Sequence, residues 1–200
     1  MARRVIHLYG LSRHAPFFGE PRTNIIFKAG EATVLAAEGQ YTDAMPEVLI
    51  GSVNGPVGHA FASMMGQSVG HTRFFAIRDL NQLARPATMM TSKVTISSAE
   101  YIELFGGVVQ GAIADAVVDS VSDGVIPKDA VDDLCIVVTV WLDPRCAGHA
   151  ELDKKDLYRT NYEAMKLAIA RALKGEPSID ELIKNRKSIK HYALEGVVEN

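Results

Sequence analysis

The chain has 200 residues, of which 48% are hydrophobic and 22% charged, proportions that exclude a fully disordered chain and allow a sizeable core. There are 21 Lys and Arg residues against 24 Asp and Glu, which gives a net charge of −3. A general nucleic-acid-binding protein shows a basic excess, so we expect no nucleic-acid partner.

Two cysteines, Cys135 and Cys146, are too few for a disulfide framework and lack the CxxC spacing of a zinc site. The apolar runs stay below the roughly 18 to 20 residues of a membrane span. The basic start of the chain is not followed by the unbroken apolar run of a signal peptide. We therefore expect reduced thiols and a cytoplasmic protein without a membrane segment.

Residues 1–27 are rich in turn-forming residues and are interpreted as an N-terminal extension with one short strand at about 5–9. The remaining residues, 28–200, are expected to form one domain. Its first half predicts strands at 33–37, 47–50, 71–80 and 89–96. A helix is expected at 56–67, because Pro56 suits a first helical turn.

The second half begins with a predicted long helix at about 98–122, whose apolar residues recur every 3.6 positions. Gly106 and Gly107 inside it predict a kink or close packing. A short helix at 127–133 precedes a nearly all-apolar run at 135–142, which is typical of a central strand. A further helix at 156–174 ends at Gly175, before a short amphipathic piece at 179–183.

This order of strands and helices predicts an α/β or α+β layered domain. The helix at 98–122 is long enough to provide a parallel crossover between two strands, although the pattern leaves the topology open.

Motifs for chemistry are few. The sequence has no P-loop, GxGxxG, HExxH or GxSxG motif, and its six histidines show no metal-ligand spacing, so no metal site is expected. Lys93 and Thr95 share one face of an expected strand, where a cation beside a hydroxyl suits an oxygen-rich ligand. The alternative is an ordinary exposed strand face. Gln110 lies among apolar neighbours and serves either a ligand or a backbone group.

Several segments in register resemble the formaldehyde-activating enzyme family over about residues 29–191. The segments are Gly30-Glu31-Ala32, Leu49-Ile50-Gly51, Pro56 with Ala60-Phe61-Ala62, Lys93-Val94-Thr95-Ile96, Phe105-Gly106, Val125-Ile126-Pro127 with Ala130, Asp132-Asp133-Leu134, Asn161-Tyr162-Glu163-Ala164-Met165-Lys166-Leu167, Gly175-Glu176-Pro177 and Arg186-Lys187-Ser188.

The resemblance implies a single domain of the ribosomal-protein-S5-domain-2-like type, assembled as a homopentamer with a pterin site between neighbouring subunits. It implies a carbon–nitrogen lyase of the 5,6,7,8-tetrahydromethanopterin hydro-lyase type, which condenses formaldehyde with tetrahydromethanopterin to methylene-tetrahydromethanopterin and water. Tetrahydromethanopterin is then a co-substrate, and the resemblance implies neither a metal nor a tightly bound cofactor.

Carried over by position, the resemblance assigns pterin contacts to Lys93, Thr95 and Gln110. Phe75 stands where the family has a leucine, and Glu47 stands where it has an aspartate. Met45 occupies the position of the family's proposed proton-donor histidine. A thioether has no proton to donate, so Met45 cannot take over that role.

Three groups are alternatives as the acid: His59, His71, and Glu47 if burial raises its pKa. The sequence therefore leaves two main hypotheses open. One is an active or weakly active lyase, and the other is a non-catalytic formaldehyde- or pterin-binding paralogue that acts as a sensor or regulator. A related pterin or folate as substrate is a third.

Overall fold

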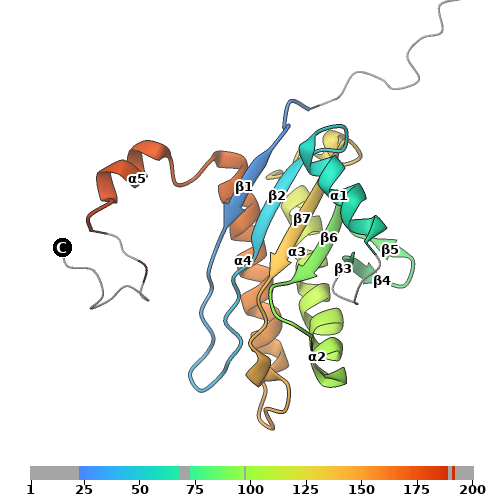
Figure 1. Ribbon diagram of the computed structural model, residues 1–200, viewed down its shortest axis with the longest axis vertical. Coiled ribbons are helices and arrows are strands. Elements are labelled where there is room, and N and C mark those ends of the chain that lie inside the picture. Colours follow the sequence, from blue (N-terminus) through green and yellow to red (C-terminus); the bar gives the residue numbers. More distant parts are fainter. Residues whose placement is uncertain (1–22, 68–72, 97, 189–190, 192–200) are drawn as a thin grey trace, which may run out of the picture.

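A computed structural model describes residues 23–67, 73–96, 98–188 and 191 of the chain. They form a single mixed α/β domain built on a five-stranded sheet (Figure 1). In spatial order the strands are β1 (Lys28–Glu31), β2 (Glu47–Ser52), β7 (Leu134–Val140), β6 (Ala87–Ser92) and β3 (Arg73–Phe75). The predicted layered α/β class is thus confirmed at this level.

Strand β7 is the centre of the sheet, as its apolar sequence predicts. It pairs antiparallel with β2 on one side and parallel with β6 on the other. The parallel pair is joined through the long helical stretch that follows β6, so the expected crossover is confirmed.

That stretch consists of α2 (Ala99–Glu103), the π-helical segment η1 (Leu104–Val109) and α3 (Gln110–Ser122). With α4 (Lys154–Lys174) it covers one face of the sheet and forms the main core (Figure 1). By length and composition alone, the helical stretch Ala99–Ser122 is apolar enough to span a membrane. Half of its most apolar window is buried inside the domain, which explains the hydropathy by core packing.

The two long helices are joined by a regular series of side-chain contacts. Tyr158 and Tyr162 of α4 donate to Asp115 and Asp119 of α3 at 2.8 and 2.7 Å, and Lys166 pairs with Asp123 at 2.6 Å. Each step moves four residues along both helices, so the contacts hold the helices in register.

Helix α1 (Pro56–Gly66) lies on the opposite face, where Val57, Phe61 and Met64 pack over β6 and β7 in a smaller apolar cluster. The short helix α5 (Ile179–Asn185) has no buried residue and projects from the rest of the domain (Figure 1). Two single 3₁₀ turns, η2 (Lys128–Ala130) and η3 (Pro144–Cys146), flank β7.

Three strand predictions were wrong in detail. The apolar run 33–37 makes only an isolated bridge between Val34 and Ala44, and the first strand is instead β1. The expected strand 71–80 is divided into β3 and β4 (Ile77–Asp79), and β4 pairs separately with β5 (Gln82–Leu83). Strand β6 ends at Ser92, so Lys93 and Thr95 lie beyond it. The strand expected at 5–9 lies outside the described residues.

Candidate active site

Three polar side chains meet where β2 begins, on the face of the sheet opposite α3 and α4. Glu47 is the first residue of β2, and Thr139 of β7 is its direct partner in the antiparallel register. Lys93 follows the last residue of β6, the strand on the other side of β7. Neighbouring strands therefore bring together residues that are far apart in sequence.

The contacts within this cluster are short. Lys93 Nζ lies 2.7 Å from Glu47 Oε1 and donates to the carbonyl oxygen of Met45 at 2.9 Å. The Thr139 hydroxyl donates to Glu47 Oε2 at 3.0 Å. Both carboxylate oxygens of Glu47 are thus held, and the ammonium group is bonded to the main chain of Met45.

The ion pair with Lys93 holds the pKa of Glu47 below its usual value, because the hydrogen bond from Lys93 outweighs partial burial and Thr139 adds to it. The condition under which Glu47 was considered a proton shuttle, a pKa raised by burial, is therefore not met. At neutral pH Glu47 is a carboxylate and a hydrogen-bond acceptor.

Two hollows flank the cluster on the same face of the sheet. One, of about 610 Å³, lies over β1, β2 and β7 and has an apolar floor that includes Ala29, Leu49 and Val137. The other, of about 470 Å³, is lined by Thr33, Leu35, Asp43, Met45, Trp141, Asp143 and Arg145. Glu47 and Thr139 border the first hollow and Met45 the second, so the polar cluster lies between them.

Phe75 is half-buried at the end of β3 and packs in the cluster beneath α1, with its ring centroid 5.6 Å from that of Phe61. It points to the same side of the sheet as the polar cluster. Its assignment as an apolar wall for a pterin stays a prediction.

Gln110 lies in the helical layer on the other side of the sheet. Its side-chain nitrogen donates to the carbonyl oxygen of Gly106 at 2.8 Å, within the π-helical turn that displaces the regular backbone bonds. Of the two roles considered for Gln110, the structure thus displays the contact with a backbone group. The glycine pair coincides with this π-helical segment, where the sequence predicts an irregularity.

Within one subunit the structure brings together Glu47 and Lys93, but not Gln110. Thr95 is exposed in the segment after β6.

His59 is exposed on α1, which follows the end of β2 that is distant from Glu47. His71 lies outside the described residues. Across the described ranges, no three His, Cys, Asp or Glu side chains are grouped to hold a metal ion.

The sequence-based interpretation missed two residues of the site. Thr139 contacts Glu47, and its signal was a lone hydroxyl within the apolar run 135–142. Trp141, the residue that follows the end of β7, lines the second hollow.

One known protein family matches most of the chain. The family model described as formaldehyde-activating enzyme matches residues 29–194. The chain belongs to the formaldehyde-activating enzyme family. That range contains every residue of the polar cluster and both of its flanking hollows.

Curated relatives of two lengths are similar to the chain. A protein of Methanosarcina barkeri named 5,6,7,8-tetrahydromethanopterin hydro-lyase is 38% identical over 72% of this chain and 79% of its own length. The bifunctional enzymes Fae/Hps of Methanothrix thermoacetophila and Methanosarcina mazei are 41% and 40% identical over 74% and 84% of this chain. The matched part is only 37% and 41% of those two longer relatives.

Proposed function

We propose that this protein acts in one-carbon metabolism as a lyase that condenses formaldehyde with tetrahydromethanopterin, giving methylene-tetrahydromethanopterin and water. The observation that carries the proposal is the Lys93–Glu47 ion pair beside an apolar hollow of about 610 Å³. Support also comes from the relative of similar length, which is named for this reaction.

The reaction needs a bound pterin and a proton for the departing hydroxyl. A pterin amine adds to the formaldehyde carbonyl and forms a carbinolamine, water leaves to give an iminium carbon, and a second amine closes the ring with loss of a proton. In this site the Glu47 carboxylate accepts hydrogen bonds from pterin N–H groups, while the Lys93 ammonium places positive charge beside it. Thr95, Gln110 and Phe75 complete the proposed pterin contacts.

The weak point of this site for catalysis is position 45. A positioned general acid typically contributes about 10²- to 10⁴-fold to the rate, and Met45 cannot provide one. Holding the reactants together still accelerates the condensation, so we expect a slow enzyme rather than an inert protein. His59 and His71 stay candidates for a substitute acid, and tetrahydromethanopterin is proposed as a co-substrate without a tightly bound cofactor.

We further propose a homopentamer of ribosomal-protein-S5-domain-2-like subunits, with each pterin site between two neighbours. Two features support an intersubunit site. The outer face of β1 and β2 is open beside the polar cluster, and Gln110 lies in the opposite layer of the same subunit. A neighbouring copy can bring its own Gln110 to the open face.

The division into an extension at 1–27 and a domain at 28–200 stays a prediction, as does the cytoplasmic location.

A second candidate function is a non-catalytic formaldehyde- or pterin-binding regulator. The specific observation in its favour is Met45, combined with a Glu47 that is ionised at neutral pH and has no proton to give. The two functions differ in turnover, not in binding.

The deciding experiment is the stopped-flow rate of methylene-tetrahydromethanopterin formation with wild type, Met45→His and a buffer blank. We expect wild type to exceed the blank and Met45→His to exceed wild type by about 10²- to 10⁴-fold, the contribution of a general acid. Met65→His, at an exposed methionine on α1, is the matched control and leaves the rate unchanged. If wild type reacts no faster than the blank while Met45→His gains activity, the regulator is favoured. If neither wild type nor Met45→His exceeds the blank rate and neither binds a pterin, both functions are contradicted.

A further inference from the structure

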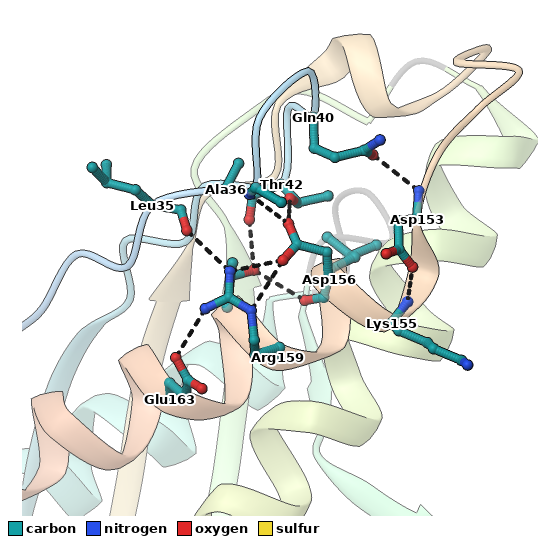
Figure 2. Close-up of polar contacts among 12 residues, drawn as sticks. Leu35, Ala36, Gln40, Thr42, Asp153, Lys155, Asp156, Arg159 and Glu163 are labelled. Carbon is teal, nitrogen blue, oxygen red and sulfur yellow. Dashed lines mark hydrogen bonds and ion pairs between the residues drawn. The ribbon is translucent and has the colours of Figure 1, made fainter.

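We propose that Asp156, in the first turn of α4, is a positioning residue for the candidate active site. It holds the 35–44 loop, the segment from Leu35 to Ala44 that leads directly to Met45 and Glu47. Figure 2 shows this contact, in which the loop lies against the N-terminal end of the helix. For its effect on turnover this inference depends on the proposed function.

The Asp156 carboxylate is buried, with 6% of the side chain exposed, and both oxygens are used. Oδ2 accepts from the backbone N–H of Ala37 at 3.0 Å and from the Thr42 hydroxyl. Oδ1 accepts from Nε and Nη2 of Arg159 at 3.0 and 2.7 Å (Figure 2). One side chain thus joins the two limbs of the loop to each other and to α4.

Residues next to Asp156 strengthen the same attachment. Arg159 Nη2 also donates to the carbonyl oxygen of Leu35 at 3.2 Å, and the Thr160 hydroxyl donates to that of Thr42. At the tip of the loop, Gln40 accepts from the N–H of Asp153, the residue that caps α4 (Figure 2). The loop is therefore fixed along its length by the first turns of one helix.

The loop's third attachment comes from the segment after β7. The Arg145 guanidinium lies 4.0 Å from the centre of the Tyr41 ring, and the ring of His149 lies 5.3 Å from it. The Cys146 thiol donates to the carbonyl oxygen of Tyr41. These contacts hold Tyr41 at the tip of the loop, whereas Asp156 joins the two limbs of the loop to each other.

The chain between the loop and the site is short and braced. Ala44 exchanges two backbone hydrogen bonds with Val34, both of 3.0 Å, and Pro46 is buried. Met45, between them, presents the carbonyl oxygen that receives Lys93 Nζ. Met45 and Glu47 follow Thr42 by three and five residues. A shift of Thr42 is therefore passed along the chain to both of them, and so to the ion pair between Glu47 and Lys93.

An ionised carboxylate is the group that this arrangement needs. Ala37, Thr42 and Arg159 all present donors, so Asp156 must accept from all of them. Asparagine has nearly the same shape, but one of its two groups is a donor and would face another donor. Asp156→Asn is therefore a test of the contact that preserves side-chain volume.

The experiment compares Asp156→Asn with Asp119→Asn in the full-length protein. Asp119 also joins α4 to another element, because Tyr162 donates to it, and this contact lies between α3 and α4 and not at the 35–44 loop, which makes Asp119 a matched control. The readouts are hydrogen exchange of the amides at 36–42 and a carboxyl-carbon NMR titration of Glu47, assigned with Glu47→Gln. Steady-state kinetics are added for each variant made in a parent protein, wild type or Met45→His, that has measurable turnover.

We expect faster exchange at 36–42 and a Glu47 pKa that rises toward its usual value in Asp156→Asn, with neither change in Asp119→Asn. Where turnover is measurable, kcat falls by about 10- to 100-fold with a smaller change in KM, as for a misplaced group. If Asp156→Asn does not fold, Thr42→Val removes one of the same bonds and is read in the same way.

The inference is overturned if the loop amides exchange faster in Asp156→Asn but the pKa of Glu47 does not change. It is also overturned if the pKa of Glu47 shifts equally in the Asp119→Asn control. Because the titration and the exchange need no turnover, they decide the positioning role even if the proposed lyase function fails.

Discussion

Glu47 and Lys93 show how two single residues set the charge of the candidate site. The pKa of Glu47 is lowered, so the carboxylate and its ion pair are present above the usual glutamate pKa and are lost only as pH falls through the lowered value. The pair therefore persists across neutral and mildly acidic pH. Glu47 is well exposed, so the effect on folding stability is small.

Removing the ammonium tests this account. In Lys93→Met we expect the pKa of Glu47 to rise, because burial then opposes ionisation and only the Thr139 hydrogen bond favours it. The measurement is a carboxyl-carbon NMR titration. Lys166→Met, which removes a lysine from the α3–α4 contacts, is the control and leaves Glu47 unchanged. A Glu47 pKa that stays low in Lys93→Met contradicts the assignment of the ion pair as its cause.

At this scale the sequence supports candidates for the site residues, but it does not predict the contacts between them. The family resemblance selected Glu47 and Lys93 among many charged residues. It did not reveal that they contact each other, because β2 and β6 lie on opposite sides of β7 and their pairing with it is non-local. Lys93 also contacts the carbonyl oxygen of Met45. Every residue has this backbone atom, so the type of residue at position 45 could not predict the contact.

Among the elements, a long helix with a regular apolar period and a strand with a nearly unbroken apolar run were predicted best. The helix expected at 156–174 and the central strand expected at 135–142 match α4 and β7 within about two residues at each end. The run 33–37 is apolar enough for a strand, yet the backbone groups of Leu35, Ala36 and Ala37 bond to side chains of Arg159, Asp43 and Asp156. Two of these partners lie more than 100 residues away, beyond any local pattern.

The contact between β1 and α4 gives a prediction about packing. A Cβ atom on Gly30 would lie 2.5 Å from the carbonyl oxygen of Ala168 and 2.7 Å from the amide nitrogen of Ala172, and neither is a flexible side-chain end. We expect Gly30→Ala to destabilise the fold by about 1–3 kcal/mol, the usual cost of overpacking.

The measurement for Gly30→Ala is urea unfolding, with Gly66→Ala at the end of α1 as the control. A Cβ at Gly66 meets no atom within 4 Å, so that variant keeps or slightly raises the stability. Equal stability of the two variants would show that β1 can move away from α4 without cost.

At the scale of the whole molecule, the domain has one sheet face covered by helices along its length and the other covered only in part by α1. The uncovered part holds the candidate site, and the side chain of Gln110 lies in the layer behind it. Such a face suits a partner that completes the site, which agrees with the proposed ring of five subunits. Light scattering is then expected to give a mass near five times 21.7 kDa.

Subunit mixing tests whether Glu47 and Gln110 act from different copies. Glu47→Gln and Gln110→Ala are each expected to lose turnover, in wild type or in the Met45→His background, whichever has the higher rate. When the two variants are unfolded, mixed in equal amounts and refolded together, about one interface in four regains an intact Glu47 from one copy and an intact Gln110 from its neighbour. We therefore expect about a quarter of the unmutated rate, against almost none for either variant refolded alone. If both residues served a site within one subunit, no mixed interface would be intact and the mixture would stay as inactive as its components.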